Sequence, residues 1–114
     1  MNSDILSLSN QCVYNNEMKC ANKSVEESRL VFDDKLMTNL TNEIFYKNNK
    51  WLEDALNPKR PVIFIDYSLF LKEYPINKIP NNTTNTIEVD IIKLLFKSFK
   101  ILEYDLNNIS VITP

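Results

Sequence analysis

The chain contains no glycine in its 114 residues, although average usage of roughly 7% predicts about eight. Glycine supplies the positive φ angles of helix C-caps and tight turns, and glycine-rich loops bind phosphate groups. A P-loop and a dinucleotide-binding fingerprint are therefore both excluded. Asparagine also tolerates positive φ angles, so the 16 asparagines are expected at many of those positions. Their abundance, with that of lysine and isoleucine, is explained by AT-rich codons.

Composition and charge exclude several classes of function. The 13 basic and 15 acidic side chains give a net charge of −2, so this chain has no basic field for dense phosphate binding. Histidine is absent, which removes Ser-His and Cys-His nucleophile pairs and the commonest zinc ligand. Cys12 and Cys20 are expected to be reduced thiols, with Cys12 on the apolar face of a helix. No apolar run approaches the roughly 18 residues of a bilayer span, so no membrane partner is expected.

The first half of the chain predicts short helices. Residues 3–15 place apolar side chains on one face, with Ser3 as the expected N-cap and Asn15-Asn16 ending the helix in place of glycine. A polar loop is expected to follow. Between 35 and 49 the pattern is weak and indicates an irregular or helical segment. Residues 51–56 predict one or two helical turns.

The second half predicts a strand, a helix and a strand. Residues 61–67 contain four consecutive apolar side chains, as in a strand covered on both faces, and residues 109–113 predict a second buried strand. Between them, residues 86–104 predict a long amphipathic helix. A further short strand is expected at 29–32. The fold class expected is therefore α/β, with a right-handed crossover in a parallel sheet. Asp66 is interpreted as a turn residue, with a position on a ligand-binding edge as the alternative.

Two groups of residues are candidates for binding, and none is a candidate for catalysis. Asn85 and Glu88 have the spacing of a capping box at the start of the long helix, which is compatible with a role near nucleic acid. They follow a long connection over 68–84, which is of a length typical of functional or disordered loops. Aromatic side chains offer stacking surfaces for single-stranded bases, although in a small α/β domain such residues are more often core or half-buried boundary residues. These are Phe45, Tyr46, Trp51 and Tyr67.

Four motifs occur in the order and spacing of superfamily 1 helicases. Residues 1–20 resemble the family's M-N-x-x-I-x-x-L-S-N followed by Y-x-x-x-L-x-C, and residues 51–67 resemble W-L-x-x-x-x-x-P followed by P-V-x-F-L-N. Asn85-x-x-Glu88 is similar to the family's N-x-T-E-A helix start, and residues 109–114 to I-G-x-I-T-P-Y-R-x-Q. Within the superfamily, the Leu-Ser-Asn run and the Lys-x-Cys ending most resemble the eukaryotic DNA replication ATP-dependent helicase/nucleases.

The resemblance implies that residues 1–114 are a fragment of the second RecA-like motor domain, incomplete at both ends. It implies an ATP-dependent DNA helicase, with an endonuclease in the full-length protein, that processes Okazaki-fragment flaps and resects ends in DNA replication and repair. ATP and Mg²⁺ would bind between two RecA-like domains, and the iron–sulfur cluster would belong to the nuclease domain, so none of these sites is expected in this chain. The fragment alone is expected to be inactive.

The resemblance also implies where this chain meets DNA. Asn85 and Glu88 are expected to contact single-stranded or flap DNA, together with Thr113 and Pro114 and, beside an arginine outside the chain, Asn2. The remaining partner is the rest of the helicase polypeptide, and the implied location is the nucleus, with the mitochondrion as a further compartment. Two alternatives stay open: a fragment of a related RNA helicase of the nonsense-mediated-decay type, or a non-enzymatic α/β binding module.

Overall fold

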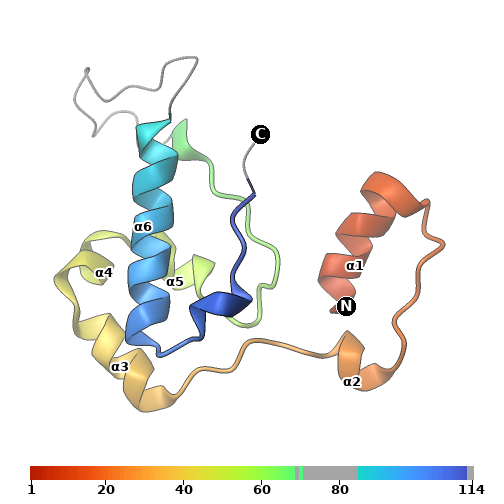
Figure 1. The fold of residues 1–114 in the computed structure, drawn as a ribbon, viewed down its shortest axis with the longest axis horizontal. Coiled ribbons are helices and arrows are strands. Elements are labelled where there is room, and N and C mark those ends of the chain that lie inside the picture. Colours follow the sequence, from red (N-terminus) through yellow and green to blue (C-terminus); the bar gives the residue numbers. More distant parts are fainter. Residues whose placement is uncertain (69, 71–84, 113–114) are drawn as a thin grey trace. The chain divides into compact units, whose positions relative to one another are not determined.

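The computed structural model describes residues 1–68, 70 and 85–112, and every regular element in these residues is a helix. The chain divides into two compact units. The first contains Met1–Val31 and Trp51–Phe64, and the second contains Phe32–Lys50 and Ile65–Pro114. Figure 1 shows the helices in chain order, from α1 near the N-terminus to the long helix α6.

The first unit begins with a helix that changes its pitch. Helix α1 (Ser3–Ser9) continues into the π-helical turn η1 (Asn10–Tyr14), which confirms the expected helix. Its N-cap is Asn2 and not Ser3, because the Asn2 Oδ1 accepts a hydrogen bond from the Asp4 amide at 2.9 Å. The helix ends at Asn15 and Asn16, whose φ angles are 47° and 64°. Asparagine therefore takes the left-handed positions that glycine usually occupies, as expected.

Two short helices complete the first unit. Helix α2 (Lys23–Glu26) lies in the segment expected to be a loop, and its N-cap Asn22 accepts from the Val25 amide at 3.0 Å. Helix α5 (Trp51–Ala55) confirms the helical turns expected there, and it buries Leu52 completely. Both thiols are free, and the Cys12 side chain in η1 is exposed, not set into an apolar face.

The second unit is built around α6 (Thr86–Ile101), which confirms the long amphipathic helix. The segment expected to be irregular or helical forms α3 (Asp34–Asn42) and α4 (Ile44–Asn48), and a 3₁₀ turn, η4 (Leu106–Asn108), follows α6. Leu40 of α3 and Ile87 of α6 are completely buried. Ser98 is also completely buried, and its hydroxyl donates to the Leu94 carbonyl at 2.8 Å, so no polar group is stranded there.

Aromatic contacts hold the C-terminal half of α6. The rings of Phe99 and Tyr104 lie 5.4 Å apart between centroids, and Phe32 lies 6.4 Å from Phe99 and 6.5 Å from Tyr104. These tilted and edge-on geometries are the favourable ones for aromatic pairs. The Lys97 ammonium lies 4.1 Å from the centroid of the Phe45 ring in α4, a cation–π contact. Helix α6 is therefore tied both to the segment before α3 and to α4.

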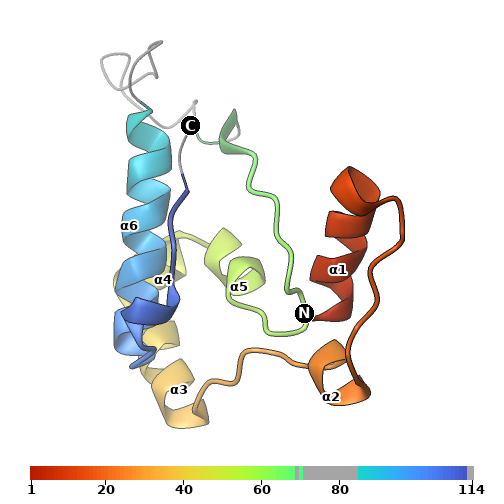
Figure 2. The same ribbon diagram turned by 45° about the vertical axis from the view of Figure 1, so that its right-hand side comes forward.

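The expected parallel sheet is wrong, because the described residues contain no β-strand. Residues 29–32, 62–66 and 109–112 have no regular structure, and Figure 2 shows 109–112 running alongside α6. Their valine and isoleucine side chains favour an extended backbone, but a strand forms only where its main chain pairs with a neighbouring one. The described residues hold no such pairs, so neither a RecA-like sheet nor its crossover is present. The remainder of the expected long connection, 71–84, lies outside the described residues.

The apolar core is small and much apolar surface stays exposed. The buried apolar side chains are Leu6, Leu40, Leu52, Leu56, Ile87 and Leu102. By contrast, Phe64 and Ile112 are 92% and 93% exposed, and both lie in segments that were expected to be buried strands. No helix within the described residues has the length and apolar character needed to span a bilayer.

Candidate functional site

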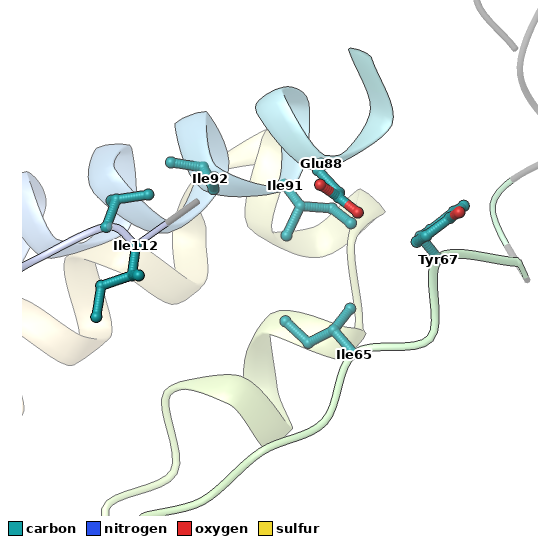
Figure 3. A pocket seen from close by; sticks show the side chains of 7 residues that line it. Ile65, Tyr67, Glu88, Ile91, Ile92 and Ile112 are labelled. Atoms are coloured by element: carbon teal, nitrogen blue, oxygen red, sulfur yellow. The ribbon is translucent and has the colours of Figure 1, made fainter. Parts of the chain in front are cut away.

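An apolar groove lies along one side of α6, within the second unit. It encloses about 290 Å³, and we call it the α6 groove. Its lining residues are Ile65, Tyr67, Glu88, Ile91, Ile92, Val111 and Ile112. Figure 3 shows the isoleucines of three segments facing the same space, with Glu88 and Tyr67 toward one end. Among these seven side chains only Glu88 and Tyr67 carry polar atoms, so the groove is apolar with a polar end.

Residue spacing explains how the sequence builds this groove. Glu88, Ile91 and Ile92 are three and four residues apart, so they share one face of α6. Ile65 lies in an irregular segment, and Tyr67 begins a 3₁₀ turn two residues later; both side chains line the groove. The sequence predicted Ile91 and Ile92 on the apolar face of the long helix, which is confirmed, but it assigned Ile65 and Ile112 to buried strands. The missed signal was the spacing that places Glu88 on the same helix face as two isoleucines.

The N-terminus of α6 brings together Asn85 and Glu88, as the sequence predicts. The Asn85 side chain accepts from the Glu88 amide at 3.2 Å, which confirms the first half of the expected capping box. The reciprocal bond, in which the Asn85 amide would donate to the Glu88 carboxylate, is absent from the hydrogen bonds of the described residues. That carboxylate is exposed and has no hydrogen-bond partner among the described residues. It is therefore available to accept hydrogen bonds from a ligand.

Asp66 has a structural role next to the groove. Its Oδ1 accepts a hydrogen bond from the Ser68 amide at 2.9 Å. Hydrogen bonds from the Ser68 side chain and main chain lower the pKa of the Asp66 carboxyl below its usual value of 3.8. The interpretation of Asp66 as a turn residue is confirmed by this bond.

Three further residues are predicted DNA contacts. Asn2 belongs to the first unit and is 5% exposed, and its side-chain amide donates to the carbonyls of Glu26 and Ser28 at 3.2 and 2.7 Å. Thr113 and Pro114 lie outside the described residues. The DNA-contact roles of all five residues therefore stay predictions. The chemistry that the groove itself offers is binding, since its lining holds one carboxylate, one phenol and no nucleophile.

The chain does not fit the cofactors that the helicase resemblance implies. Binding of ATP phosphates by a P-loop needs glycines, which this sequence lacks. No group of three or more His, Cys, Asp or Glu side chains placed to hold a metal occurs in residues 1–68, 70 or 85–112. An iron–sulfur cluster is held by about four cysteines, whereas this sequence has two. No chemical step through these groups can be assigned to these residues.

Comparison with known proteins defines the class. The AAA domain family matches residues 1–114, so the chain belongs to this family. No solved structure matches it significantly.

The relatives give a more particular likeness. The chain is 37% identical over 68 residues, 59% of its length, to the DNA replication ATP-dependent helicase/nuclease DNA2 of Saccharomyces cerevisiae. It is 33% identical over 66 residues, 58% of its length, to the protein of the same name from Gallus gallus. The resemblance to helicase/nucleases of DNA replication is thereby confirmed. The matches cover only 4% and 6% of those two proteins.

Proposed function

We propose that this chain is part of the second motor domain of an ATP-dependent DNA helicase/nuclease. The observation that carries the proposal is the family match over all 114 residues, joined to the 37% and 33% identity with two helicase/nucleases. Both relatives act in DNA replication by name, which favours the DNA enzyme over the RNA helicase and over a free-standing binding module. On this proposal the protein works in the nucleus, on flaps and DNA ends in replication and repair.

This chain contributes scaffold and DNA contacts, and not the chemistry. ATP, Mg²⁺ and the iron–sulfur cluster bind to other parts of the polypeptide, because the residues of this chain do not fit them. Asn85 and Glu88 contact single-stranded DNA at the start of α6. Thr113 and Pro114, which belong to the later motif at 109–114, also contact single-stranded DNA. A carboxylate repels phosphates, so Glu88 faces base amino groups and not the DNA backbone.

The test is DNA binding by the helicase polypeptide that contains this segment, with fluorescein-labelled oligo(dT) and oligo(dC). Cytosine has an exocyclic amino donor that thymine lacks, so Glu88→Gln is expected to weaken oligo(dC) binding about 3- to 10-fold and oligo(dT) binding less. The matched control is Glu53→Gln, which alters another exposed helical carboxylate, in α5. Equal affinity of the Glu88→Gln and wild-type proteins for both oligonucleotides would contradict the DNA role of Glu88.

A second variant separates capping from DNA contact at Asn85. Serine is about as good an N-cap as asparagine, so Asn85→Ser retains the bond to the Glu88 amide and removes only the side-chain amide donor. If Asn85 touches DNA, this variant unfolds like the wild type but binds oligo(dT) more weakly. If its only role is to cap α6, both stability and binding stay unchanged.

A further inference from the structure

The α6 groove is bordered by apolar side chains that the chain itself leaves uncovered. Ile112 is 93% exposed and Val111 is 49% exposed, although both line the groove. Across the groove, Ile91 and Ile92 of α6 are only half-buried. Burial of apolar surface stabilises a protein by roughly 25 cal/mol per Å². A partner that covered these exposed and half-buried side chains would therefore gain binding energy.

The main chain on both sides of the groove is also uncovered. The amide and carbonyl groups of Ile65 on one side, and of Val111 and Ile112 on the other, have no hydrogen-bond partner among the described residues. Unpaired main-chain groups in a non-helical, apolar segment are a ready template for a second extended chain. The groove therefore offers apolar contacts at its floor and main-chain hydrogen bonds at its edges.

We propose that the α6 groove is the docking site for one extended, apolar segment of the same polypeptide, supplied from outside residues 1–114. This inference depends on the proposed function to the extent that it needs a longer protein. The length of the relatives supports it, because the matched regions are 4% and 6% of their chains. The docked segment covers Ile112 and Val111 with its side chains and pairs its main chain with theirs.

Glu88 marks one end of the space that the docked segment fills. Its exposed carboxylate lies at the end of the groove near Tyr67, while the isoleucines fill the rest (Figure 3). A segment whose apolar side chains cover the isoleucines and stop short of Glu88 fills the apolar part of the groove and leaves that carboxylate free for DNA.

Hydrogen exchange of two proteins tests the proposal: the 114-residue chain alone, and the longer polypeptide expressed with its natural flanking sequence. We expect the amides of Val111 and Ile112 to exchange roughly 100-fold more slowly in the longer polypeptide than in the isolated chain. Equal exchange in the two proteins would overturn the proposal. Slow exchange in the isolated chain that appears only when it dimerises in sedimentation would also overturn it, because a second copy would then be the occupant.

A charged substitution gives an independent readout. Ile112 is so exposed that Ile112→Asp is not expected to disturb the isolated chain, yet it places a carboxylate where the docked segment lies. In the longer polypeptide it should therefore remove most of the protection at Val111. The matched control is Ile44→Asp, at a 76% exposed position of α4 away from the groove. If the Val111 amide is equally protected from exchange in the Ile112→Asp and Ile44→Asp variants, docking is ruled out. This outcome is independent of the oligonucleotide assays.

Discussion

Asn2 joins the start of α1 to the segment that follows α2. Its Oδ1 accepts from the Asp4 amide, and its Nδ2 donates to the carbonyls of Glu26 and Ser28. The sequence singled out Asn2 as a DNA contact, whereas the structure uses its side chain for a helix cap and a long-range tie. The cap was expected one residue later, at Ser3, because serine and asparagine are equally good N-caps and helix boundaries from sequence are uncertain by a residue or two.

Replacing Asn2 is expected to weaken the first unit. Asn2→Ala removes one cap bond and leaves two carbonyls without their donor, which should lower the free energy of unfolding by about 1 to 3 kcal/mol. Urea unfolding followed by circular dichroism measures the change. Asn108→Ala is the control, at an exposed position with no side-chain hydrogen bond among those described, and should change stability by less than about 0.5 kcal/mol. Equal effects of the two variants would show that the side-chain hydrogen bonds of Asn2 do not contribute to the free energy of unfolding.

Asp66 gives a prediction about pH. Its pKa is lowered in the folded chain by hydrogen bonds from Ser68, so NMR titration of the carboxyl should give a value below 3.8, the usual one. The stabilising contribution of this carboxylate is complete above pH 3.8 and is lost as the pH falls through the folded-state pKa. Ser68→Ala should raise the pKa only part of the way back, because the main-chain amide still donates. A titration unchanged by Ser68→Ala would show that the hydroxyl contributes nothing.

At the scale of elements, the helices with a clear residue pattern were predicted correctly, whereas α2 was missed and the expected strands did not form. Residue spacing within 3–15, 51–56 and 86–104 contains the information for a helix, because helical hydrogen bonds form within the segment itself. Strand propensity in 61–67 and 109–113 says only that the segment favours extended backbone, while pairing depends on a neighbour elsewhere. The same limit applies to the site. Asn85 and Glu88 were found from a local motif, whereas the α6 groove depends on three segments brought together.

Helix α3 was hidden by a weak pattern, and a core substitution tests its role. Leu40 is completely buried, so Leu40→Ala should lower the free energy of unfolding of the second unit by about 2 to 5 kcal/mol. Ile44→Ala, at a 76% exposed position of α4, should change it by less than about 0.5 kcal/mol. The measurement is urea unfolding monitored by circular dichroism, which reports the helices α3 and α6 of this unit. A neutral Leu40→Ala variant would contradict the packing of α3.

At the scale of the whole molecule, the proposed function assigns binding and catalysis to different parts of the protein. The chain has neither glycine nor histidine, and this composition alone excludes a P-loop and the common nucleophile pairs. The isolated 114-residue chain should therefore release no phosphate from ATP and Mg²⁺ above the buffer rate, with or without single-stranded DNA. Phosphate release that is proportional to the concentration of the purified chain would contradict this separation of roles.

We propose that these residues work as part of a longer DNA helicase/nuclease, and sequencing the transcript on both sides of their codons tests this directly. The proposed function predicts Gln-Tyr-Arg immediately before Met1 and Tyr-x-x-Gln after Pro114 in one reading frame, with a nuclease domain upstream. In-frame stop codons on both sides in an expressed message would contradict it. The chain would then be a separate 114-residue protein, without the rest of a helicase.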